Sequence, residues 1–99
     1  MRRGTTPAIT IQTDTDLTGY PTVVLTIRDK GTGSLDLNKT DLSITAEEIT
    51  VTLTQAQTLA FTAGDLRFQL RAVDSGGNAI ASNYMYARLD DVLKDGAIT

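Results

Sequence analysis

Residues 64–89 of the chain read GDLRFQLRAV, then DSGGN, then AIASNYMYARL. The apolar residues of the first part occupy every second position: Leu66, Phe68, Leu70 and Ala72. Such alternation is the pattern of a strand with one buried and one wet face. The glycines of residues 74–78 favour a hairpin turn, because glycine adopts positive φ without steric cost. We therefore expect a central strand over residues 65–73 and an antiparallel partner over residues 79–89.

Three earlier segments alternate in the same way and are predicted to be strands: residues 8–13, 22–29 and 48–54. Threonine, valine and isoleucine are frequent in them, and β-branched side chains suit a pleated surface better than a helix. The turn at residues 30–34 ends the second of these segments. Residues 35–37 and 42–44 alternate only briefly, which favours either two short edge strands or one strand and a loop.

One short helical turn is predicted between the strands. Thr54 and Gln57 have the spacing of a capping box, in which each side chain bonds the backbone of the other residue. Residues 56–60 then supply one apolar side of a turn, and Gly64 ends it. Residues 90–96 are expected to form either one capped turn or a tail that leaves the domain.

The spacing of the strands in a chain of 99 residues predicts one compact domain built as a two-sheet sandwich. The expected core consists of Ile9, Ile11, Val23, Leu25, Ile27, Ile44, Ile49, Val51, Leu53, Leu59, Phe61, Leu66, Phe68 and Leu70, with several of Ile80, Tyr84, Met85 and Leu89. The predicted fold class is all-β, an antiparallel sandwich of about seven strands with one short helical turn.

The composition excludes most enzyme mechanisms. The chain contains no His and no Cys, which removes disulfides, thiolate nucleophiles, zinc fingers and His-based acid–base catalysis. Glu47 and Glu48 are sequence neighbours, and neighbours on an extended strand point to opposite faces, so they do not flank one glycoside. We therefore expect no catalytic residue and no cofactor.

Two aspartate pairs are candidate calcium ligands: Asp14 with Asp16, and Asp90 with Asp91. Calcium requires about six to eight oxygen ligands, and the sequence contains no EF-hand loop ending in a bidentate glutamate. Turn and capping roles account for these aspartates, so no metal site is predicted.

The charge pattern excludes two classes of partner. The net charge is −3, the isoelectric point is near 4.6, and the basic residues form no continuous stripe, so nucleic acid is not an expected partner. The longest apolar run, residues 23–25, is far below the roughly 20 residues that span a bilayer. A membrane is therefore not expected as a partner either.

Four side chains on the predicted outer faces remain as candidates for recognition. Tyr84 and Tyr86 are two positions apart on the last strand and are expected to share a face, where their rings suit contact with a protein or with a sugar. Arg67 and Arg71 alternate with the core positions of the central strand, either as solvated residues or as part of an ion-paired interface. The predicted interface residues are Tyr84, Tyr86, Arg67 and Arg71.

The order of turn and strand motifs is similar to that of a known family. The motifs are DLTG at residues 16–19, VLTI at 24–27, RDKGT at 28–32, LTQ at 53–55, GDLRFQL at 64–70 and DSGGN at 74–78. Over residues 7–93 this order resembles the immunoglobulin-like domain at the N-terminus of baseplate upper proteins in tailed phages of Gram-positive bacteria and in related prophages. The resemblance implies an immunoglobulin-like sandwich in a virion structural protein. The chain departs from antibody domains, because it has no Cys and no Trp, and no family site residue is carried over.

These observations predict a flexible arm over residues 1–6, an immunoglobulin-like β-sandwich over residues 7–93 and a tail over residues 94–99. The predicted function is that of a non-enzymatic structural module of a phage or prophage tail or baseplate, located in the virion and assembled in the cytoplasm of the bacterial host. Its expected partners are other tail or baseplate proteins or a second copy of the chain. The alternative is a carbohydrate-binding sandwich whose tyrosines stack on sugars.

Overall fold

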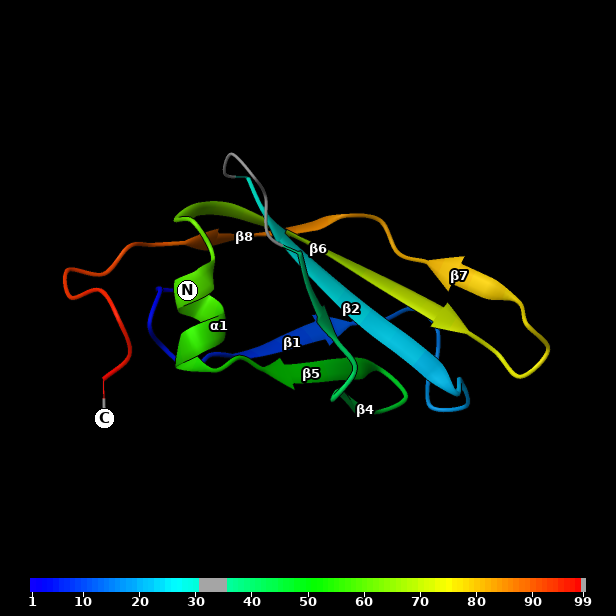
Figure 1. The fold of residues 1–99 in the computed structure, drawn as a ribbon. Coiled ribbons are helices and arrows are strands. Elements are labelled where there is room, and N and C mark those ends of the chain that lie inside the picture. Colours follow the sequence, from blue (N-terminus) through cyan, green and yellow to red (C-terminus); the bar gives the residue numbers. More distant parts are fainter. Residues whose placement is uncertain (31–35, 99) are drawn as a thin grey trace.

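The computed structural model describes residues 1–30 and 36–98, which form two antiparallel sheets and one short helix (Figure 1). The elements in chain order are β1 (Ala8–Gln12), β2 (Thr22–Asp29), β3 (Asp36–Lys39), β4 (Ser43–Ile44), β5 (Glu48–Thr52), α1 (Gln55–Ala60), β6 (Gly64–Val73), β7 (Ala79–Ala81) and β8 (Met85–Leu89). One sheet has the order β1-β5-β4, and the other has the order β3-β2-β6-β7, with β8 also paired to β6.

The strand order identifies the type of sandwich. The order β1-β5-β4 corresponds to strands B, E and D of an immunoglobulin domain, and β3-β2-β6-β7/β8 corresponds to C′, C, F and G. The predicted all-β, immunoglobulin-like fold class is therefore confirmed. The strands number eight in the described residues, where about seven were expected, because the last predicted strand is split in two.

The core lies between the two sheets and follows the predicted alternation. The buried hydrophobic residues are Ile11, Leu17, Val23, Leu25, Ile27, Ile49, Val51, Leu53, Phe61, Leu66, Phe68, Leu70, Ala72 and Leu89. Burial of each large aliphatic side chain contributes roughly 1.5 to 3 kcal/mol before the loss of chain entropy. The inner face of the sandwich is therefore the main source of its stability.

The structure corrects several of the predicted core positions. Ile80 and Tyr84 are exposed, with relative exposures of 42% and 55%, so their assignment to the core was wrong. Ile9 and Ile44 are only partly buried. Leu17, which the sequence placed in a turn, is 4% exposed and belongs to the core, because the β1–β2 connection folds back over the open side of the sandwich.

α1 begins with the predicted capping box. The backbone N–H of Gln57 donates to the Thr54 hydroxyl at 3.2 Å, and the backbone N–H of Thr54 donates to the Gln57 side chain at 2.9 Å. The helix closes one end of the sandwich, at the left of Figure 1. Since it has six residues, it contributes a cap to the core and no extended helical surface. None of the helical structure in the described residues is long and apolar enough to cross a membrane.

The N-terminal segment, residues 1–6, contacts α1 and the end of β8. The Arg3 side chain donates to the carbonyl of Leu59 at 2.8 Å and to that of Phe61 at 3.0 Å. The Arg3 backbone N–H donates to the carbonyl of Asp90 at 2.9 Å. The hydroxyl of Thr58, which is fully buried, donates to the carbonyl of Thr5 at 2.9 Å. These bonds join the first residues of the chain to the closed end of the domain.

The predicted hairpin at residues 74–78 is confirmed, but its second arm is not one continuous strand. Gly77 has a φ of 82°, as a turn glycine requires. β7 pairs with β6 so that Arg71 faces Ala81, whereas β8 pairs with β6 so that Arg67 faces Tyr86. Between these two pairings, the β7–β8 side has one more residue than β6. This extra residue is a β-bulge between β7 and β8.

Ser82 holds this bulge in place. Its hydroxyl accepts a hydrogen bond from the backbone N–H of Leu70 at 3.0 Å, and its backbone N–H donates to the Leu70 carbonyl at 2.8 Å. Its own carbonyl, which a regular ladder would use, instead accepts from the Gln69 side chain at 3.0 Å. The side chain thus replaces a backbone acceptor where the ladder is interrupted.

The two briefly alternating segments near residues 35–37 and 42–44 form β3 and β4, which lie in different sheets. Leu35 and most of the predicted turn at residues 30–34 lie outside the described residues. Residues 91–96 form no helix, and beyond them Ile98 exchanges backbone hydrogen bonds with the Gln55 side chain.

Candidate interface on the five-stranded sheet

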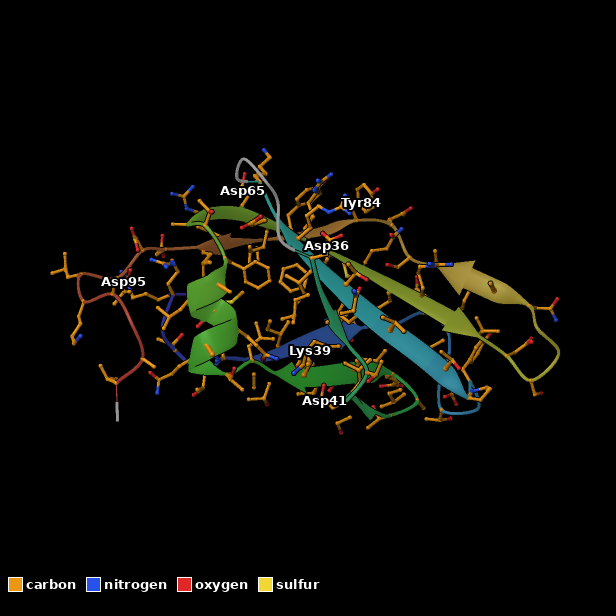
Figure 2. All side chains as sticks on the ribbon, in the orientation of Figure 1. Asp36, Lys39, Asp41, Asp65, Tyr84 and Asp95 are labelled. Carbon is orange, nitrogen blue, oxygen red and sulfur yellow. The ribbon has the colours of Figure 1, made fainter. Side chains whose placement is uncertain are left out.

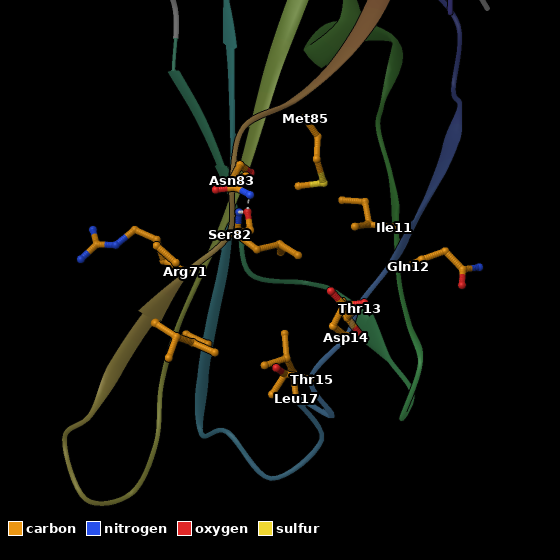
Figure 3. A pocket seen from close by; sticks show the side chains of 14 residues that line it. Ile11, Gln12, Thr13, Asp14, Thr15, Leu17, Arg71, Ser82, Asn83 and Met85 are labelled. Carbon is orange, nitrogen blue, oxygen red and sulfur yellow. Dashed lines mark hydrogen bonds between the residues drawn. The ribbon is translucent and has the colours of Figure 1, made fainter.

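The outer face of the five-stranded sheet brings the predicted interface residues together. Arg67 of β6 lies directly opposite Tyr86 of β8. The Arg67 guanidinium carbon lies 5.6 Å from the centroid of the Tyr84 ring, which is a cation–π contact. Arg71 follows Arg67 by four positions on the same strand and so shares its face, and its side chain points away from the cleft between the sheets (Figure 3).

Arg28 and Asp36 extend this face toward β2 and β3. Arg28 stands opposite both Asp36 and Arg67, and its Nε and Nη2 donate to the two carboxylate oxygens of Asp36 at 2.5 and 2.7 Å. These hydrogen bonds lower the pKa of Asp36 and raise that of Arg28. A bidentate geometry fixes the guanidinium in one orientation. Arg28 and Tyr84 line the same shallow depression, and Asp36 and Tyr84 are labelled in Figure 2.

Arg67 and Arg71 differ from the other cations of this face because they form no ion pair with any described residue. Lys30 lies 3.7 Å from Asp65, and Arg88 lies 3.6 Å from Asp90. The Nε of Arg67 is buried and has no hydrogen-bond partner among residues 1–30 and 36–98. The face therefore carries two arginines without an ion-pair partner among the described residues, on a chain whose net charge is −3, and the charge of Arg67 acts on Asp36 only at longer range.

The tyrosines supply exposed aromatic surface beside these charges. Tyr84 is 55% and Tyr86 is 64% exposed, the largest exposed aromatic side chains of the described residues. A shallow depression of about 120 Å³ lies next to them and is lined by Thr26, Arg28, Arg67, Phe68, Gln69 and Tyr84. A depression of this size accepts a single side chain and is too small for an enclosed substrate site.

Two of the candidate calcium ligands, Asp16 and Asp91, have local structural partners. Asp16 accepts hydrogen bonds from the backbone and the hydroxyl of Thr18 at 2.9 and 2.6 Å, which lower its pKa. Asp91 accepts from the Arg3 side chain at 2.7 Å, which also lowers its pKa. In the part of the chain that the structure describes, no three acidic side chains gather as metal ligands would.

The chain matches no known protein family, no curated protein and no solved structure. The interface therefore has to be interpreted from its own chemistry: exposed tyrosines, two unpaired arginines and one fixed arginine–aspartate pair.

The sequence predicted four residues of this face, Tyr84, Tyr86, Arg67 and Arg71. It did not predict Arg28 and Asp36. The alternation of β2 placed Arg28 on a wet face, which is the available signal for its role. Asp36 was not found because its place opposite Arg28 depends on the register of β3, a segment of only four residues.

Proposed function

We propose that this chain is a non-enzymatic docking module of a phage or prophage tail, which attaches to a neighbouring subunit through the outer face of its five-stranded sheet. The observation that carries the proposal is the pairing of Arg67 with Tyr84 and Tyr86 on an exposed face. Tyrosine and arginine are the residues most enriched at the energetic centres of protein interfaces. The resemblance of the motif order to baseplate upper proteins supplies the proposed setting in the virion.

Physical arguments also support a docking role. A tyrosine ring presents large contact area with few rotatable bonds, so little side-chain entropy is lost when it is covered. Arg67 is already ordered by its contact with Tyr84, and Arg28 is held by Asp36. A partner that supplies a carboxylate to the unpaired guanidinium groups would gain charge-assisted hydrogen bonds at little ordering cost.

The test compares two double variants with the same change of charge. Arg67→Glu with Arg71→Glu alters the candidate face, and Arg2→Glu with Lys94→Glu is the control at the opposite end of the domain. The chain is co-purified with each tail protein encoded beside it, and its mass is followed by light scattering as the concentration rises. We expect an association that the first pair weakens at least about tenfold and that the control retains. A chain that stays monomeric and captures no tail protein contradicts the proposal.

The second candidate is carbohydrate binding, which the exposure of Tyr86 favours. Sugar rings stack on open aromatic faces, but the guanidinium of Arg67 already lies over Tyr84. A glycan array decides between the two functions. Saturable binding of a sugar that Tyr86→Ala abolishes, without any protein partner, would favour the carbohydrate-binding module.

A further inference from the structure

The free edge of β1 has the geometry of a vacant strand position. The Thr13 N–H donates to the Glu47 carbonyl at 2.9 Å, and the Leu53 N–H donates to the Pro7 carbonyl at 3.0 Å. In an antiparallel ladder, bonded residues alternate with non-bonded ones. The backbone groups of Ala8, Thr10 and Gln12 therefore point away from β5, and no strand within residues 1–30 and 36–98 pairs with them.

The remaining sheet edges carry features that discourage the addition of a strand, and β1 does not. β4 has only two residues. β3 turns Lys39 inward, where its side chain is 8% exposed. The β7–β8 edge is interrupted by the bulge and carries Arg88. Short edges, inward-pointing charges and bulges are the means by which proteins protect sheet edges, whereas residues 8–13 have no charge and no proline.

A cleft of about 330 Å³ lies beside this edge (Figure 3). Its apolar lining comes from both sheets and from the β1–β2 connection: Ile11, Leu17, Leu70, Ala72, Ile80 and Met85. Asp14 and Arg71 also line it. In an immunoglobulin domain, the place next to strand B is taken by strand A, and β1 corresponds to strand B. The cleft and the free backbone groups of β1 thus mark one position that a strand would fill.

We propose that this position receives an extended, uncharged peptide segment of a partner protein, which adds to β1 as an antiparallel strand and places alternate apolar side chains in the cleft. The main chain of the segment would pair with Thr10 and Gln12, as in other cases of strand addition. The segment is expected to be uncharged where it contacts residues 8–13, which carry no charge, and where its side chains meet the apolar lining, because a charge buried there would lose its hydration without a partner.

The geometry favours a single segment over the edge of another folded sandwich. The incoming chain has to lie between β1 and the segment that joins β7 to β8, since the cleft is bounded on both sides. A second copy that offered its own β1 would also bring the rest of its two-sheet sandwich into this space. Among the docking-face residues only Arg71 also lines the cleft, and its side chain points away from it (Figure 3), so either proposal can fail without the other.

The test supplies such a segment within the same molecule. Arg2 forms a parallel bridge with Asp90 at the end of β8, so a segment added before Met1 can run back along the cleft. The probe is Thr-Val-Thr-Val-Thr-Val-Gly fused ahead of Met1, and amide hydrogen exchange of Thr10 and Gln12 is measured by NMR. We expect exchange to slow at least about tenfold relative to the unfused chain.

Two controls separate strand addition from other effects. A fusion in which serine replaces each valine keeps the length but removes the apolar side chains, and it should leave exchange unchanged. The substitution Thr10→Pro removes an edge donor and should abolish the slowing at Gln12. Equal slowing with the serine fusion, no slowing with the valine fusion, or protection in the unfused chain that grows with its concentration would each overturn the proposal.

Discussion

The two threonines that face each other across β1 and β5 provide a matched test of the free edge. Thr10 and Thr50 are register partners, and their hydroxyls lie 3.3 Å apart. Replacement of either by proline removes the same side-chain contact. The backbone N–H of Thr10 points to the open edge, whereas that of Thr50 points to Ser43 of β4, as the alternation of the ladder requires.

The expected costs differ because proline removes a backbone donor. At Thr10 no ladder bond is lost, so we expect Thr10→Pro to change the free energy of unfolding by less than about 1 kcal/mol. At Thr50 the ladder bond is lost and the proline ring faces β4, which is expected to cost about 2 to 3 kcal/mol. For a domain of this size, a cost of about 2 to 3 kcal/mol corresponds to a loss of roughly 8 to 24 °C in melting temperature.

Urea denaturation followed by circular dichroism measures both variants against the parent chain. As a control, the slope of unfolding free energy against urea concentration should be the same in both variants as in the parent chain. An equal slope shows that the same surface is exposed on unfolding. If Thr10→Pro is as destabilising as Thr50→Pro, the outer edge of β1 is already paired, and the reasoning about a vacant strand position is wrong.

Further predictions concern the bulge, the N-terminus and acid stability. Ser82→Ala leaves the buried N–H of Leu70 without its acceptor and should lower the free energy of unfolding in urea by about 1 to 3 kcal/mol. The control is a chain from which Asn83 is deleted. There the regular ladder supplies a backbone acceptor, and the same substitution should cost under about 0.5 kcal/mol. Arg3→Ala removes two bonds to carbonyls at the end of α1 and should cost about 1 to 3 kcal/mol by thermal unfolding, and an equal loss in Arg2→Ala would show that the effect is not specific. The pKa of Asp36 is lowered chiefly by a hydrogen bond from an arginine, so its contribution to stability is present above its unfolded-state pKa and is lost as the pH falls from about 4 through the folded-state pKa. The difference in melting temperature between parent and Asp36→Asn should therefore shrink in that range, and a constant difference would contradict this.

Most of the fold could be predicted from sequence because its information is local. The alternation of β2, β5 and β6 decides which side chains are buried, and period-2 patterns are visible without any knowledge of neighbours. The capping box at Thr54 and the glycine turn at residues 74–78 are equally local signals. These features depend on the chemistry of a few consecutive residues, which is why they agree with the structure.

The features that could not be predicted depend on contacts between distant segments. Leu17 has no periodic neighbours, and it is buried because the β1–β2 connection turns its side chain inward, where it lines the cleft. Lys39 points inward because the register of β3 sets it opposite Leu25, and its ammonium group reaches Asp41 at 3.2 Å. No local pattern in four residues distinguishes this register from one shifted by a single position.

The bulge explains why the tyrosines are exposed and why sequence alternation misplaced one of them. If the register of β7 continued without interruption, Tyr84 would stand opposite Phe68 and Tyr86 opposite Leu66, so both rings would enter the core. The extra residue reverses the alternation, sends Met85 inward opposite Phe68 and turns both tyrosines toward Arg67. The hydroxyl of Ser82 stabilises this reversal, because it accepts a hydrogen bond from the backbone N–H of Leu70, which the bulge would leave unpaired. The chemistry of the candidate interface thus depends on one serine located in the break between two strands.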